Sequence, residues 1–133
     1  MASRDRRDLA QVLLRKARGD ELTVRALLRE EVPDEVVGFH AQQAVEKALK
    51  AVLAARGIDY AFSHDIAYLD DLLASNGIEV PEAVRAAEEL RPWAAEFRYE
   101  DPAGCTAALD RERARDQAGA AIGWASGIVD ATA

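Results

Sequence analysis

Apolar residues recur along the chain every three or four positions, as they do in amphipathic helices. The pattern is strongest over residues 35–56, which contain no proline and are rich in Ala, Leu, Glu, Lys and Gln. One broad arc of this segment is made of small and apolar residues, namely Val37, Ala41, Ala44, Val45, Ala48, Leu49, Ala51, Val52 and Ala55. An arc of this width predicts a central helix that has neighbours on more than one side.

Other segments with helical periodicity cover residues 5–18, 21–31, 64–75, a stretch that begins at 82, and about 106–130. Gly19 is expected to end the first helix, and Asp20 to serve as the N-cap of the second. Asp34 and Ser63 are the expected N-caps of the central helix and of the helix over 64–75. Gly57 suits a left-handed C-cap after the central helix.

The last helix carries Gly119, Gly123 and Gly127 at intervals of four residues. We interpret these glycines as a flat ridge that lets a neighbouring helix approach closely. No segment has a credible strand pattern. The sequence therefore predicts one all-α domain over residues 1–133, built as an up-and-down bundle of about five helices.

The polar arc of the central helix carries His40, Gln43, Lys47 and Lys50 as one strip. Beside this strip run Phe39, Glu46 and Leu53, each seven residues apart. Two large apolar residues on a polar arc indicate contact with something else. Either another helix of the same chain covers Phe39 and Leu53, or the two residues form a dimer stripe that meets a partner chain.

The net charge of −7 is unevenly distributed, because residues 1–31 hold eight of the 17 Lys and Arg residues and only six of the 24 Asp and Glu residues. An acidic body opposes non-specific nucleic-acid binding, although a local basic patch could still hold a nucleotide. The single cysteine, Cys105, fits a reducing compartment. The sequence shows neither a signal peptide nor an apolar run long enough to span a membrane, so we expect a cytoplasmic protein.

Few residues are suited to chemistry. Two histidines and one cysteine are too few for a structural zinc site, and the phosphate-binding glycine motifs are absent, so we expect neither a metal nor a cofactor. His40 and His64 are acid–base candidates, with a purely structural role as the alternative for each. Arg98 and Tyr99 lie between two prolines. Arg98 either pairs with an acidic neighbour such as Glu46 or contacts an anion or nucleotide.

Three motifs in order resemble the prokaryotic HEPN domain: QQAVEKALKA over residues 42–51, SHDI over 63–66, and Arg98-Tyr99. The resemblance covers nearly the whole chain. It implies a dimeric bundle of about five helices, of the kind often encoded beside a minimal nucleotidyltransferase in pairs that look like toxin–antitoxin modules. The positions that match the family pattern are Gln43, Glu46, Lys47, Lys50, His64, Asp65, Arg98 and Tyr99. We add His40 as a further candidate for ligand or partner contact.

Many HEPN proteins are metal-independent RNases. Their activity is tied to an Arg and a His separated by four to six residues and brought together across a dimer. Here ten residues separate Arg29 from His40, seven separate Arg56 from His64, and no His follows Arg98. We therefore predict a non-catalytic HEPN module, dimeric or partnered by a nucleotidyltransferase, that either binds a nucleotide or presents a regulated surface. The alternative is an RNase toxin that uses His64 with Arg56 or Arg98.

Overall fold

The computed structural model describes residues 3–94 and 108–132. Within these ranges the chain forms the helices α1 (Ser3–Ala26), α2 (Asp34–Ala55), α3 (Ile66–Ser75), α4 (Glu82–Arg85), η1 (Ala86–Trp93, a 3₁₀-helix) and α6 (Arg111–Ala131). The described ranges contain no strand, and the helices pack against one another. The prediction of an all-α bundle is confirmed.

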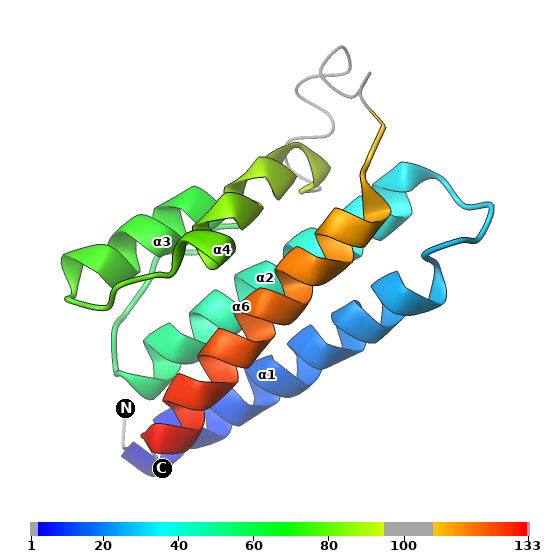
Figure 1. Ribbon diagram of the computed structural model, residues 1–133. Coiled ribbons are helices and arrows are strands. Elements are labelled where there is room, and N and C mark those ends of the chain that lie inside the picture. Colours follow the sequence, from blue (N-terminus) through cyan, green and yellow to red (C-terminus); the bar gives the residue numbers. More distant parts are fainter. Residues whose placement is uncertain (1–2, 95–107, 133) are drawn as a thin grey trace.

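The three longest helices, α1, α2 and α6, lie side by side, and both ends of the chain lie at the same end of the bundle (Figure 1). α2 is the central helix, because it contacts α1, α3, η1 and α6. Its apolar arc is buried as predicted, and Val45, Ala48, Leu49 and Val52 are each 0% exposed. A helix in contact with four others can bury such a broad arc.

α1 is one continuous helix, so the prediction that Gly19 ends a first helix was wrong. A glycine inside a helix costs about 1 kcal/mol relative to alanine. The buried face formed by Leu14, Ala17 and Val24 continues across Gly19, and the packing of that face on α2 outweighs the local cost. Asp20 is therefore not an N-cap, and its carboxylate is available to contact α2.

Two other predicted N-caps were also wrong. Pro33 occupies the N-cap position of α2, and the Asp34 carboxylate instead accepts hydrogen bonds from the Leu109 backbone N–H at 3.0 Å and from Arg111 Nε at 3.1 Å. These two donors lower the pKa of Asp34. Asp65 rather than Ser63 caps α3, because its carboxylate accepts from the Ala67 N–H at 3.0 Å.

The C-cap prediction for α2 is confirmed. Gly57 has a φ of 70°, in the left-handed region that glycine adopts without strain. The Ile58 N–H donates to the Leu53 carbonyl at 2.9 Å, which closes the end of the helix. The chain leaves α2 there and returns across it in the segment over residues 58–65.

Only the first of the three glycines on α6 lies against another of the described helices. A Cβ at Gly119 would lie 3.0 Å from Glu21 Oε2 on α1, but one at Gly123 or Gly127 would have no neighbour within 4 Å. The interpretation was therefore wrong for these last two glycines. The buried face of α6 consists instead mainly of alanines: Ala114, Ala118, Ala121 and Ala125.

A different glycine allows a close approach. A Cβ added to Gly38 on α2 would lie 2.6 Å from the Trp93 ring, so η1 packs directly on this bare position. In the part of the chain that the structure describes, no helix combines the length and the hydropathy needed to cross a membrane.

Candidate functional site

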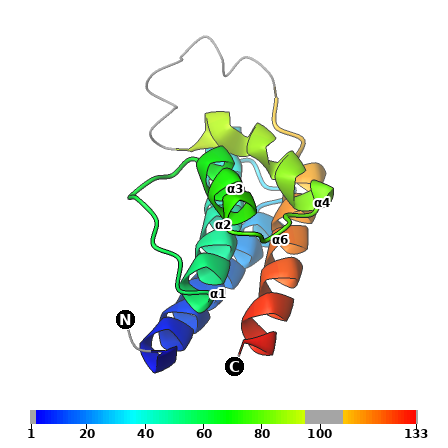
Figure 2. The same ribbon diagram turned by 90° about the vertical axis from the view of Figure 1, so that its left-hand side faces the viewer.

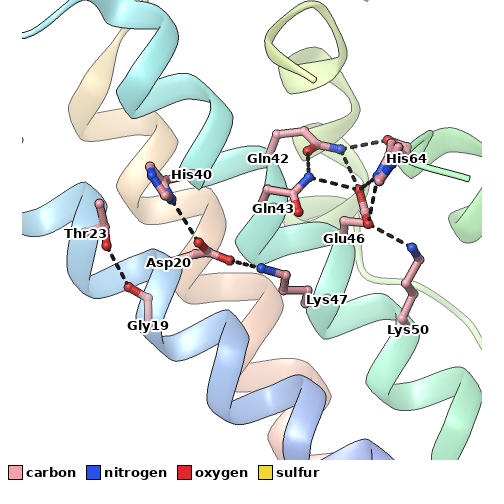
Figure 3. A network of polar contacts seen from close by, with 10 residues as sticks. All are labelled: Gly19, Asp20, Thr23, His40, Gln42, Gln43, Glu46, Lys47, Lys50 and His64. Carbon is pink, nitrogen blue, oxygen red and sulfur yellow. Dashed lines mark hydrogen bonds and ion pairs between the residues drawn. The ribbon is translucent and has the colours of Figure 1, made fainter. Parts of the chain in front are cut away.

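A buried carboxylate on α2 organises a cluster of polar side chains. The Glu46 side chain is 4% exposed and lies 2.8 Å from Lys50 Nζ and 3.0 Å from His64 Nδ1 (Figure 3). The side-chain amides of Gln42 and Gln43 donate to the same carboxylate at 3.2 Å and 3.3 Å. We call Glu46 and these four partners the Glu46 centre. The carboxylate is thus surrounded by four side chains that donate to it.

The Glu46 centre also holds the segment between α2 and α3 in place. Gln42 Nε2 donates to the backbone carbonyl of His64 at 2.7 Å, and Gln43 Nε2 donates to Gln42 Oε1 at 2.8 Å. Asp65, the next residue, caps α3 and lies 3.7 Å from Arg91. His64 is thus fixed through both its backbone and its ring.

The orientation of His64 leaves one ring nitrogen available. Nδ1 faces the Glu46 carboxylate, so it carries the proton, and Nε2 is free to accept or, when protonated, to donate. The imidazole is 32% exposed, and the Phe62 ring packs edge-on against it with centroids 5.1 Å apart. Phe62 itself is 89% exposed, which is unusual for a large aromatic residue.

Lys50 connects the centre to two aromatic rings. Its Nζ lies 5.7 Å from the Tyr60 ring centroid and 6.0 Å from that of Phe62, within the range of cation–π attraction. Burial, with a smaller contribution from the Glu46 carboxylate, raises the pKa of Tyr60, so its hydroxyl stays protonated at neutral pH. We call Lys50, Tyr60, Phe62 and His64 the aromatic patch.

A smaller polar cluster joins α1 to α2. The Asp20 carboxylate, on α1, lies 2.9 Å from His40 Nδ1 and 2.6 Å from Lys47 Nζ (Figure 3). His40 and Lys47 are 30% and 25% exposed. We call these three residues the Asp20 centre.

The structure divides the predicted site residues between the two centres. Gln43, Glu46, Lys50 and His64 meet at the Glu46 centre, whereas His40 and Lys47 belong to the Asp20 centre. Sequence reasoning had not included Gln42, Asp20, Tyr60 or Phe62 among the site residues. Gln42 precedes Glu46 by four residues, a helical spacing that could have indicated the contact.

The residues proposed to act with His64 are not assembled around it. Arg56 is exposed, and no hydrogen bond joins it to His64 within the described ranges. Arg98 and Tyr99 lie outside the described residues. Leu53 is 0% exposed, so it belongs to the core and cannot form one end of an exposed dimer stripe. Phe39 is half-buried, with its ring edge-on to His40 at 5.6 Å.

A further buried carboxylate lies outside both centres. Asp70 on α3 is 0% exposed, and neither carboxylate oxygen has a hydrogen-bond partner among the described residues. Burial, followed by the neighbouring Glu88, raises its pKa to about 8. Arg85 approaches the same region, donating to the Asp70 backbone carbonyl at 3.4 Å and to Glu88 Oε2 at 3.3 Å.

The described part of the chain contains no group of three or more His, Cys, Asp or Glu side chains that could hold a metal ion. The HEPN domain family model matches residues 10–132, a range that includes both polar centres. The chain belongs to the HEPN domain family. No curated protein and no solved structure matches it with significance. In this HEPN domain the matched QQAVEKALKA segment is the part of α2 that supplies Gln42, Gln43, Glu46 and Lys50.

Proposed function

We propose that this HEPN domain is a non-catalytic binding module and that the aromatic patch takes a nucleotide. The observation that carries the proposal is the position of Phe62. This ring is 89% exposed, yet it packs edge-on against a fixed histidine and lies 6.0 Å from an ammonium group. An exposed ring beside an ammonium group and an imidazole offers a face for a base and polar groups for a phosphate.

The chemistry of the patch suits such a ligand. Bases stack on aromatic rings with little dependence on base identity. Lys50 Nζ has three hydrogens, of which the contact with Glu46 uses one. His64 Nε2, when protonated, is a second donor to phosphate oxygens. The Glu46 centre fixes these donors before any ligand arrives, which lowers the entropic cost of binding.

The reason for proposing binding without catalysis is the surroundings of His64. Cleavage at a ribose hydroxyl needs a cation that stabilises the developing charge on the phosphate as well as an acid–base group. Among the described residues, the cation of the patch, Lys50, is already paired with the Glu46 carboxylate at 2.8 Å, and no hydrogen bond or ion pair joins Arg56 to His64.

One observation favours the alternative of a metal-independent RNase. A carboxylate that holds Nδ1 of a histidine orients the ring for acid–base work through Nε2, as it does in catalytic triads. Incubation of labelled total RNA with EDTA and either the wild type or His64→Ala distinguishes nucleotide binding from RNase activity. We expect intact RNA in both samples. Cleavage by the wild type that is lost in His64→Ala would make the protein an RNase.

We further propose that the module acts as a homodimer or beside a nucleotidyltransferase in a toxin–antitoxin-like pair, which family membership supports. Light scattering coupled to gel filtration measures the mass in solution. A monomeric mass at micromolar concentration would rule out the homodimer. Co-purification with a nucleotidyltransferase encoded beside it would support the complex.

Binding itself is tested by calorimetric titration of AMP and ATP into the wild type, Phe62→Ala and a control, Val36→Ala. Both substitutions remove an exposed apolar side chain, and Val36 lies near the start of α2, outside the patch. Loss of one stacked base should weaken binding by about 5- to 150-fold in Phe62→Ala, with no change in the control. Equal affinities for all three proteins would contradict the proposal.

A further inference from the structure

One exposed face of α1 is lined with arginines. Arg4, Arg7, Arg15, Arg18 and Arg25, together with Gln11 and Leu22, follow one another at intervals of three or four residues, and all seven are exposed. At about 100° per residue they fall within one narrow arc of the helix, which we call the arginine stripe. Its first and last arginines are separated by roughly 32 Å along the axis, at 1.5 Å per residue.

Most of the charge on this stripe is not neutralised within the chain. Arg4, Arg7 and Arg15 make no hydrogen bond or ion pair with any residue that the structure describes. Arg18 donates to a neutral group, Ser126 Oγ on α6, at 3.0 Å. Arg25 approaches Glu21 at 3.4 Å. The acidic residues beside the stripe are Asp8 and Glu21 on α1 and Asp130 on α6, whose carboxylate accepts from Ser126 Oγ at 3.4 Å, so the five arginines outnumber them.

The glycines of α6 border the stripe. Gly119 faces Glu21 of α1, and Ser126 contacts Arg18, so this side of α6 runs along the stripe. Gly123 lies between those two positions in the helix, and a Cβ added there would have no neighbour within 4 Å. A ligand chain can therefore approach the α6 backbone closely beside the guanidinium groups.

We propose that the arginine stripe, with the open glycine edge of α6 beside it, binds the phosphate backbone of a single-stranded nucleic acid. Guanidinium groups contact phosphate oxygens through two parallel hydrogen bonds. The stripe bears five like charges and a single apolar residue, Leu22. Protein–protein interface cores are depleted of charge, whereas nucleic-acid interfaces are polar and strongly positive, so this composition favours a nucleic acid over an acidic protein.

This surface is separate from the aromatic patch and extends the proposed function. The segment between α2 and α3, which carries the three rings of the patch, lies on the opposite side of the molecule from α6 (Figure 2). α1 carries no aromatic residue, so the stripe offers charge without stacking and should bind without base preference.

The test is fluorescence anisotropy of a labelled 16-nucleotide RNA of mixed sequence with the wild type and with Arg7→Gln/Arg15→Gln. The control is Lys16→Gln/Arg91→Gln, which removes the same charge from positions outside the stripe and outside α6. If all five arginines contact phosphates, the logarithm of affinity should fall with the logarithm of salt with a slope of about −3.5. The slope of the stripe variant should be shallower by about 1.4, and that of the control unchanged.

No binding by the wild type at low salt, or equal weakening in the two double variants, would overturn the proposal. Tighter binding to a poly-glutamate peptide than to the RNA would assign the stripe to an acidic protein. Saturating AMP, which occupies the aromatic patch, should leave the difference in salt slope between the wild type and Arg7→Gln/Arg15→Gln unchanged. Arg7→Gln/Arg15→Gln should in turn leave AMP binding unchanged. These two crossed measurements distinguish failure of the stripe from failure of the nucleotide site.

Discussion

Glu46 and Asp70 are both buried carboxylates, but their surroundings differ. Glu46 accepts from two amides, an imidazole and an ammonium group. Asp70 is 0% exposed and has no hydrogen-bond partner among the described residues, and its neighbour Glu88 is another acid. The first carboxylate is surrounded by hydrogen-bond donors. The second keeps a proton, because its pKa is raised to about 8 by burial and by Glu88.

The difference shows that burial alone does not decide what an acid contributes. A buried charge is tolerated when donors replace the lost water, and it then orients those donors. A buried acid without donors stays neutral near neutral pH and acts mainly through packing. The comparison therefore assigns ligand positioning to the Glu46 centre and a pH-dependent structural role to Asp70.

The largest expected effect follows from removing Glu46. Glu46→Ala leaves the ammonium group of Lys50, which is 11% exposed, without its acceptor. Breaking a buried pair in this way should lower the free energy of unfolding by about 3–5 kcal/mol, measured by urea denaturation. The exposed Glu79 is the control, and Glu79→Ala should change stability by less than about 0.5 kcal/mol. Similar losses in the two variants would mean that the Glu46 centre contributes little.

Asp70 should make stability depend on pH. The folded protein holds this proton up to about pH 8, whereas the unfolded chain releases it near the ordinary value of 3.8. Between these values the unfolded state binds fewer protons, so stability falls as pH rises, by up to about 1.4 kcal/mol per pH unit, and levels off above the folded pKa.

Asp70→Asn has no proton to lose at this position, so its unfolding free energy should decline less steeply between pH 5 and pH 8 than that of the wild type. Urea denaturation at each pH unit measures both slopes. The other titrating groups are shared by the two proteins, so parallel profiles would show that Asp70 is ionised in the folded state.

A smaller effect is expected from Gln42. Gln42→Leu removes the donor to the His64 carbonyl and one donor to Glu46, leaving buried acceptors unsatisfied at a cost of about 1–3 kcal/mol. Amide hydrogen exchange over residues 60–65 should accelerate, because the segment loses its tie to α2. Gln43→Leu, which keeps that tie, is the matched control. Unchanged exchange in Gln42→Leu would mean that other contacts hold the segment.

The smallest effect concerns the cap of α3. Asp65→Ala removes the acceptor for the Ala67 N–H and should cost about 1 kcal/mol. Asp65→Asn retains an acceptor and should therefore lose only part of this stabilisation. Thermal denaturation of both variants measures the difference. The ion pair with Arg91, at 3.7 Å and with a half-exposed guanidinium, should add little. A loss in Asp65→Asn as large as in Asp65→Ala would show that charge rather than capping matters.

The sequence predicted the central helix because the buried positions of α2 follow the helical period. It predicted the left-handed C-cap at Gly57 because glycine adopts a positive φ without strain. The prediction failed at Gly19. Glycine is a local signal for the end of a helix, but the packing of α1 on α2 outweighs that signal, and the sequence of α1 alone does not reveal this packing. The contact between Asp20 and His40 depends on how α1 is rotated and shifted against α2, which the periodicity of each helix leaves open.

The candidate site was predicted in part for the same reason. Glu46, Lys50 and His64 were singled out from the family motifs, and they meet in the structure. The exposure of Phe62 could not be inferred, because residues 58–62 form an extended, apolar-rich stretch that a core could equally have covered.

The central claim is that the aromatic patch binds a nucleotide while the Glu46 centre holds it in shape. Its most direct test is a ¹H–¹⁵N correlation spectrum of the wild type recorded during titration with AMP. We expect saturable chemical-shift changes confined to residues 46–50 and 58–65, and we expect Phe62→Ala to abolish them. Shifts elsewhere, or an unchanged spectrum at millimolar AMP, would contradict it.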